Sequence, residues 1–162
     1  AVIEGDVATE NDADRIRALG VPAHQILTGG ACHLDARLVE TGIEEGGLPE
    51  VDILFIENVG NLICPTTYDL GEDFKVVLLS VAEGDDKPVK YPAIFARAEV
   101  AVVTKSDLLP HVPFDLDSVK SQIASLNPNG TVLVTSSLQG DGMDEWFDLL
   151  RARLQAKRQS LG

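Results

Sequence analysis

Hydrophobic residues fall along this chain in short runs that do not alternate with polar positions. The runs are rich in Val, Ile and Leu. They are typical of strands covered on both faces, because a half-exposed strand alternates. Two shorter apolar stretches near the amino terminus predict two further strands. The predicted strands span residues 2–3, 25–27, 51–56, 76–81, 100–103 and 132–134.

Segments with apolar residues at helical spacing lie between several of these runs. Each has signals at which a helix starts and stops. The first helix is predicted to begin at Asn11 or Asp12, to carry Ile16 and Leu19, and to end at Gly20.

Two further helices are predicted in the second half of the chain. One begins at Asp115 or Asp117 and is closed by the turn at residues 128–130. The other follows Gly142 and is expected to direct its apolar side chains inward. These are Trp146, Phe147, Leu149, Leu150 and Leu154.

Strands that alternate with helices imply an α/β fold, a mainly parallel sheet with helices on both faces. The chain shows no repeat, low-complexity tract or long linker, so residues 1–162 are expected to form one domain. In such sheets, ligands bind at the carboxyl ends of the strands. The residues that follow each apolar run are therefore the first candidates for a site.

Composition narrows the function classes. The 162 residues include 13 basic and 26 acidic side chains, a formal charge of −13, which argues against binding to nucleic acid or to an anionic membrane. No apolar run approaches the roughly 20 residues of a membrane span, and no basic leader precedes a hydrophobic stretch. Two cysteines are too few for a disulfide scaffold. We therefore expect a soluble protein in the reducing cytoplasm, with both thiols free.

A polar tetrapeptide, residues 104–107, follows the run at 100–103. The Asp107 carboxylate can accept paired hydrogen bonds from the N1 and amino donors of guanine, while the stem of Lys105 lies along the purine. Ser136 follows the next predicted strand and is suited to presenting backbone N–H groups to the guanine carbonyl. A solvated loop and an ordinary helix cap are the alternatives.

Acidic residues follow two other predicted strands. Glu57 is followed three residues later by Gly60, a spacing that can hold Mg²⁺ and bring a backbone N–H against a γ-phosphate. Asp6 ends the opening strand and can hold Mg²⁺ or orient water. Each acid taken alone is equally well explained as a solvated strand end.

Cysteine and histidine provide the most specific chemistry. Cys32 and His33 are adjacent at a predicted strand-to-helix junction, and Cys64 follows the strand that ends near Glu57. Thiolate and imidazole ligands suit Zn²⁺ or Ni²⁺ far better than Mg²⁺. Three ligands leave a tetrahedral site one short, which water, an open position or a second subunit's cysteine can complete. The alternative is two small buried cysteines and a capping histidine.

Together these segments resemble the hydrogenase nickel-incorporation GTPases, the HypB family within the nickel-metallochaperone branch of P-loop NTPases. The resemblance runs nearly end to end through IEGDVATENDADRI, LTGGACHLDA, FIENVGNLICP, LLSVAEGDDKPVKYP and VVTKSDLLP. It implies a P-loop NTPase-like α/β fold, a homodimer with metal at its interface, and GTP hydrolysis coupled to dimerisation and nickel transfer toward [NiFe]-hydrogenase. A hydrogenase-maturation accessory protein is the expected partner.

The resemblance also assigns roles by motif. The implied cofactors are GTP, Mg²⁺, and Ni²⁺ or Zn²⁺, between which the sequence does not choose. Asp6 is the expected residue for ordering the attacking water. The metal ligands would be Cys32, His33 and Cys64, the base-reading pair Lys105 and Asp107, and the residues beside Mg²⁺ and the γ-phosphate Asp6 and Glu57.

The sequence departs from the family pattern in two ways. No GxxxxGK[ST] occurs in the 162 residues, so the phosphate cradle, its lysine and the Mg²⁺-binding hydroxyl are missing. Ala1 is therefore expected to be an internal starting point, with the family's first strand and helix removed. The milder departure is Thr104, which stands where the guanine motif commonly has asparagine.

Three functional hypotheses follow. The first is a GTP hydrolase that uses its nucleotide state to switch dimerisation and nickel release. The second is a metal-binding module with little or no hydrolysis. The third is a related urease nickel-insertion GTPase, whose ligands are expected to group as Cys-Pro-His. Here Cys64-Pro65 is followed by Thr66, which favours the hydrogenase branch.

Overall fold

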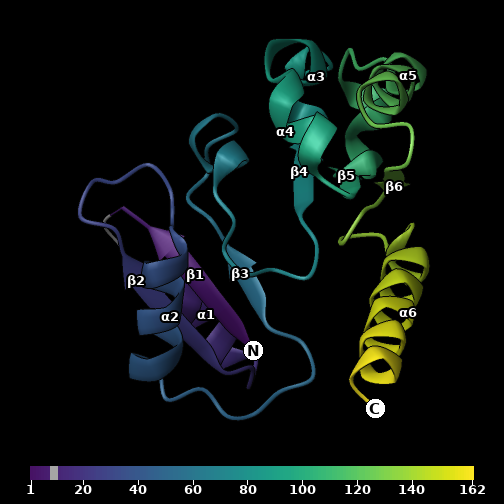
Figure 1. The fold of residues 1–162 in the computed structure, drawn as a ribbon. Helices are drawn as coiled ribbons and strands as arrows, with labels where there is room; N and C mark the ends of the chain where they lie inside the picture. The colour runs from purple at the N-terminus through teal and green to yellow at the C-terminus, as the bar shows by residue number, and fades with distance from the viewer. Residues whose placement is uncertain (8–10) are drawn as a thin grey trace. The chain divides into compact units, whose positions relative to one another are not determined.

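The computed structural model of the chain describes residues 1–7 and 11–162. These form two compact units, residues 1–73 and 74–162, and each contains a three-stranded parallel sheet (Figure 1). The parallel α/β architecture predicted from the sequence is confirmed, with the strands divided between two sheets. Part of the family-like segment at residues 3–16 lies outside the described residues.

The sheet of the first unit has the order β2-β1-β3. Its strands are β1 (Val2–Asp6), β2 (Ala23–Leu27) and β3 (Phe55–Glu57). The run at residues 51–56 was predicted to be one strand, but only its end pairs with β1. Val2 is the first residue of β1 and pairs with Phe55, so residues 51–54 lie before the first paired position.

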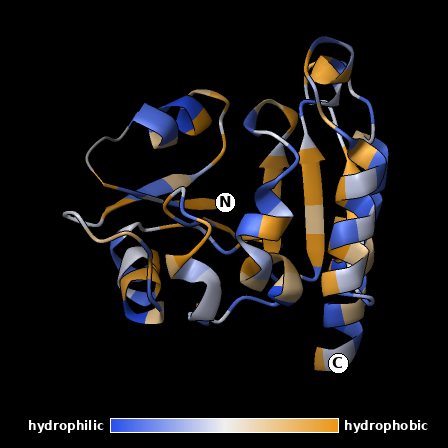
Figure 2. Cartoon of the chain, turned by 90° about the horizontal axis from the view of Figure 1, so that it is seen from above, coloured by the Kyte–Doolittle hydropathy of each residue, from blue (hydrophilic) through white to orange (hydrophobic). Residues whose placement is uncertain are grey.

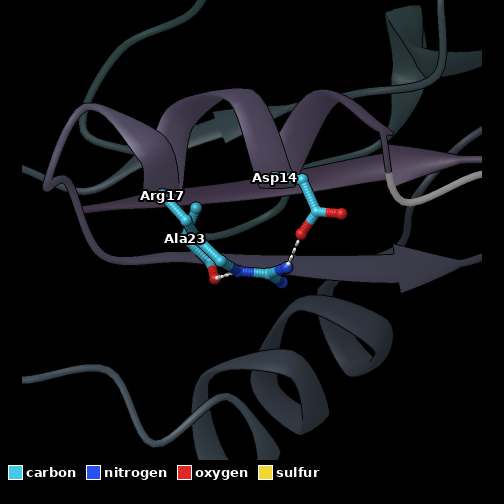
Figure 3. A network of polar contacts seen from close by, with 3 residues as sticks. All are labelled: Asp14, Arg17 and Ala23. Atoms are coloured by element: carbon cyan, nitrogen blue, oxygen red, sulfur yellow. Dashed lines mark hydrogen bonds and ion pairs between the residues drawn. The ribbon is translucent and has the colours of Figure 1, made fainter.

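Two helices, α1 (Asn11–Ala18) and α2 (Ala36–Glu45), cover opposite faces of this sheet (Figure 3). Arg17 attaches α1 to β2, because its Nε donates to the Ala23 carbonyl at 2.9 Å while its guanidinium pairs with Asp14 at 2.6 Å. The prediction that this helix carries Leu19 is wrong: α1 ends one residue earlier, and Leu19 is 81% exposed in the turn that follows.

The face beneath α2 holds the core of the first unit, formed by Ile3, Ile26, Leu34 and Val39. Two glycines make this packing possible. A Cβ on Gly42 would lie 2.6 Å from the side chain of Ile26, and a Cβ on Gly5 would lie 2.7 Å from that of Leu34. The close packing of Leu34 against Gly5 fixes the position of Leu34, which follows His33 in the sequence.

The sheet of the second unit has the order β4-β5-β6. Its strands are β4 (Val76–Ser80), β5 (Val100–Thr104) and β6 (Thr131–Val134). As predicted, Val100 to Val103 are all buried. The prediction that the run at 76–81 is covered on both faces is wrong, because side chains alternate across a strand and Leu78 is 59% exposed between buried Val77 and Leu79.

Three helices belong to the body of this unit: α3 (Lys87–Lys90), α4 (Pro92–Arg97) and α5 (Leu116–Leu126). The start predicted for the last of these is confirmed at Asp115, whose side chain accepts from the Ser118 N–H.

The carboxyl-terminal helix α6 (Met143–Leu161) follows Gly142, as predicted. None of its residues is fully buried. The expected inward packing is found in part, because Trp146, Leu149, Leu150 and Leu154 are half-buried, and it is wrong for Phe147, which is 42% exposed. Hydrophilic and hydrophobic residues are mixed along the helix (Figure 2). No other element in the described part of the chain contacts α6 extensively, which explains the exposure. None of the described helices has the length and apolarity of a membrane span.

Candidate functional site

Two segments of the first unit bring Cys32, His33 and Cys64 together. One ligand atom from each residue lies within 4.8 Å of the others. Cys32 and His33 come from the loop between β2 and α2, and Cys64 begins a short 3-10 turn, η1 (Cys64–Thr67), after β3. Cys32 is exposed, while His33 and Cys64 are half-buried. The alternative of two small buried cysteines does not describe this arrangement.

The donor set fits a thiophilic divalent ion. Two sulfurs and one imidazole can face a single centre, and Sγ of Cys32 lies 3.6 Å from Nδ1 of His33. A hydrogen bond shared with Cys64 raises the pKa of the Cys32 thiol, with desolvation second. An incoming ion therefore displaces a thiol proton, and this set suits Zn²⁺ or Ni²⁺.

Side chains that the sequence analysis missed hold these ligands. Oδ1 of Asn61 accepts from the N–H groups of Ile63 and Cys64, at 2.8 and 3.1 Å. The Tyr68 ring packs against the His33 ring, with centroids 3.9 Å apart. Asparagine readily bonds to nearby backbone N–H groups, so the closeness of Asn61 to Cys64 was the available sequence signal.

The predicted acidic residues follow the strands of the same unit. The Asp6 carboxylate accepts from the Val7 N–H at 2.6 Å. Glu57 is an exposed residue, but partial desolvation of its carboxyl raises its pKa. Repulsion from Asp12 raises this pKa further. Gly60 is exposed and open around its Cα, so a close approach to phosphate there stays a prediction.

Glu4, a second residue missed from the sequence, lies in register with Glu57. It is buried, and its Oε2 atom has no hydrogen-bond partner among the residues that the structure describes. Burial first, and then repulsion from Glu57, raise the pKa of Glu4. Because Glu4, Asp6 and Glu57 occupy one face of the sheet, this end offers carboxylate oxygens that fit a hard divalent ion such as Mg²⁺. The available sequence signal was the position of Glu4, directly after the predicted strand at residues 2–3.

In the second unit, the loops after β5 and β6 bring Asp107 and Ser136 together. The Ser136 hydroxyl donates to Oδ1 of Asp107 at 2.5 Å, and Ser136 is fully buried. Lys105 is the only described non-glycine residue with a positive φ, 60°. It immediately precedes η3 (Ser106–His111), the 3-10 turn that carries Asp107. A half-buried carboxylate held in this way can accept from guanine.

The contact made by Ser136 differs from the one expected. Its backbone N–H donates to the Asp141 carbonyl at 2.8 Å and is not directed to a base. The residue instead positions Asp107 through its hydroxyl, which also accepts from the Gln139 N–H at 3.1 Å. The Ser136 N–H is therefore used within the loop after β6, where it bonds to the Asp141 carbonyl.

A family model describes most of the chain. Residues 1–134 match the model for the CobW/HypB/UreG nucleotide-binding domain. The chain belongs to this family. The matched range includes the Cys32, His33 and Cys64 cluster, the acidic strand ends and the Lys105–Asp107 turn.

Relatives within the family share close to half of the sequence. Hydrogenase maturation factor HypB of Escherichia coli is 48% identical over 153 residues, which are 94% of this chain and 53% of that protein. Hydrogenase/urease maturation factor HypB of Helicobacter pylori is 42% identical over 163 residues, 98% of this chain and 66% of that protein. The chain thus spans about half of the Escherichia coli relative.

Solved structures agree. The crystal structure of HypB from Helicobacter pylori in complex with nickel has a TM-score of 0.91 and 41% identity, over 97% of this chain and 75% of that one. The crystal structure of hydrogenase maturation factor HypB from Archaeoglobus fulgidus has a TM-score of 0.86 and 40% identity, over 94% of this chain and 74% of that one. The resemblance to the HypB family drawn from the sequence is confirmed.

Proposed function

We propose that the protein is a GTP-dependent nickel metallochaperone that acts in [NiFe]-hydrogenase maturation. The observation that carries this proposal is the approach of Cys32, His33 and Cys64 to within 4.8 Å of one another. The support from comparison is the HypB relatives, one of whose structures was determined with nickel. Nickel is the cargo in this proposal, and Zn²⁺ is an alternative occupant because the same donors accept it.

The proposed nucleotide-binding residues lie in two motifs. The Asp107 carboxylate would accept from the guanine N1–H and amino groups, and the stem of Lys105 would lie along the purine. Asp6 and Glu57 would hold Mg²⁺, which supplies charge stabilisation of the phosphates, and Asp6 would orient the attacking water. We assign residues 1–162 to one GTPase-type domain because the family model runs through both units.

Metal transfer is proposed to use a homodimer and a second maturation protein. Three ligands leave one position of a tetrahedral site for a partner's donor or for water. Exposure of Cys32 is consistent with transfer of the ion to such a partner. Thiolate ligands also favour the reducing cytoplasm as the location.

A second candidate function is a metal-binding module that does not hydrolyse GTP. These 162 residues contain the metal-ligand candidates but not GxxxxGK[ST], the loop that supplies the phosphate-binding lysine. The metal site is common to both candidates. GTP turnover by the protein separates them.

The first test is an anaerobic titration with Ni²⁺ and Zn²⁺, with the native mass recorded at each point. We expect the parent to bind metal and to dimerise as it loads, and Cys64→Ser to lose binding. Ser80→Ala is a control for general effects of a small substitution, because Ser80 ends a strand of the other unit. A folded parent that binds neither ion would refute the metallochaperone assignment.

A further inference from the structure

The proposed metal ligands come from two segments that are distant in the sequence. Cys32 and His33 lie in the segment after β2, and Cys64 lies in the segment after β3. The donor atoms nevertheless lie within 4.8 Å of one another. Contacts within the protein join the two segments.

Asn58 makes a hydrogen bond that joins the two segments. Its Oδ1 accepts from the backbone N–H of Leu34 at 2.8 Å, across 24 residues. The same oxygen accepts from the N–H of Val59 at 2.9 Å, which fixes the side chain against its own backbone. Both bonds end on one atom, so removal of the amide group releases both N–H groups.

The bond acts directly beside the ligands. Leu34 immediately follows His33, and its side chain is fully buried against Gly5 of β1. Asn58 immediately follows Glu57, the last residue of β3, which pairs with Glu4 of β1. One sheet thus anchors both ends of the link. Asn61 makes similar bonds near Cys64, but only across two and three residues, so it shapes one segment without joining two.

We propose that Asn58 is the positioning residue that holds the Cys32–His33 segment at metal-binding distance from Cys64. The inference rests on the proposed metal-binding function and adds to it the residue that preassembles the donor set. A preassembled set loses less conformational freedom when the ion binds, so the affinity depends on the link. Outer-shell partners of metal ligands commonly change metal affinity by about 10- to 100-fold when they are mutated.

The same bond gives the metal site a connection to the proposed nucleotide site. Asn58 is the neighbour of Glu57, and a displacement of Glu57 would move the acceptor of the Leu34 N–H. The preassembled geometry would then change at His33 as well as at Cys64. The link would thus transmit a movement at the end of β3 to the Cys32–His33 segment.

The test compares three variants in anaerobic Ni²⁺ and Zn²⁺ titrations against a chromophoric chelator. Asn58→Ala removes the acceptor, whereas Asn58→Asp retains an oxygen at the same position. Asn127→Ala is the matched control, because Asn127 makes one long-range and one local hydrogen bond in the other unit. We expect Asn58→Ala to bind about 10- to 100-fold more weakly. Asn58→Asp is expected to bind at least as tightly as the parent, and Asn127→Ala to be unchanged.

Hydrogen exchange of the metal-free parent provides a second test that does not depend on the variants folding. We expect the Leu34 amide to be protected, because it donates to Asn58 before any ion binds. Unprotected exchange of that amide, or parent-like affinity in a folded Asn58→Ala, would overturn the inference. A parent that binds no metal would overturn it together with the proposed function, whereas normal binding by the parent and by Asn58→Ala would refute the inference alone.

Discussion

The ring of Tyr68 lies against the ring of His33, with centroids 3.9 Å apart and planes inclined by 30°. Tyr68 follows the η1 turn that begins at Cys64, so the contact spans both ligand segments. Tyr68 is 41% exposed. An exposed aromatic ring in this position restricts the orientation of an imidazole that we assign as a metal ligand.

We predict that Tyr68→Leu weakens Ni²⁺ binding, whereas Tyr68→Phe does not. Aromatic pairs contribute roughly 0.5–1.5 kcal/mol beyond area burial, which corresponds to about 2- to 10-fold in affinity. The measurement is the same chelator competition. Tighter binding by Tyr68→Leu would show that the stack competes with the ion. Equal binding by all three proteins would show that the ring orients nothing.

The sequence predicted the ligand cluster better than its supports. Cys32, His33 and Cys64 stand out because their donor chemistry is rare in this chain. Asn58 and Tyr68 carry no such chemistry, and their roles depend on which segments meet in space. The strand order that brings β2 and β3 to either side of β1 is a long-range property, and local propensities do not contain it.

Burial was predicted less well at the outer elements. The apolar spacing in α6 correctly indicated a helix, but spacing cannot show whether another element covers its apolar side chains. The same limit explains Leu78, which lies in an uninterrupted apolar run and is 59% exposed. By contrast, Val100 to Val103 belong to a central strand with a neighbour on each side, and they fit the prediction.

Glu4→Gln is predicted to stabilise the metal-free protein at neutral pH. Burial raises the folded-state pKa of Glu4, so the folded state binds this proton more tightly than the unfolded state does. The free energy of unfolding therefore falls as the pH rises through the unfolded and then the folded pKa. Above the folded-state pKa, the protein bears the full cost of burying the ionised Glu4 carboxylate. Replacement by a neutral amide removes this cost at such a pH. The replacement changes the free energy of unfolding little once the pH is below the unfolded-state pKa.

Urea unfolding with a chelator present, at pH 7 and at about pH 3.5, checks this prediction against an unfolded glutamate pKa near 4.3. Glu45→Gln is the control, since it makes the same change at an exposed position in the last turn of α2. A Glu4→Gln protein that is less stable at pH 7 would mean that the carboxylate form has favourable partners in the folded state.

Asp107→Asn is predicted to change base preference from guanine to xanthine. The carboxylate is acceptor-only, whereas the amide can donate to the 2-oxo group of xanthine. Hydrogen bonds to charged groups contribute about 1.5–3 kcal/mol, so GDP binding should weaken by at least about tenfold. Competition of GDP and XDP against a fluorescent guanine nucleotide measures the change. Ser136→Ala should weaken GDP binding without favouring XDP, because it removes only the hydroxyl that holds Asp107.

Unchanged GDP affinity in Asp107→Asn would exclude this carboxylate from base recognition. Loss of all nucleotide binding together with loss of the circular dichroism of the fold would instead identify a structural defect. The Ser136→Ala protein keeps the test informative in that case, because it leaves the charge of Asp107 in place.

Gly142→Ala is predicted to destabilise the second unit much more than Gly140→Ala. Both glycines have positive φ, 67° and 86°, which costs an alanine about 1–2 kcal/mol. Gly142 also lacks space: a Cβ there would lie 2.0 Å from the Val134 carbonyl oxygen, whereas no atom of the described residues lies within 4 Å of a Cβ at Gly140. Val134 ends β6, two residues before Ser136, so the clash displaces the strand end that supports Asp107. Thermal unfolding of the two variants measures the difference, and equal losses would show that backbone conformation alone accounts for the cost.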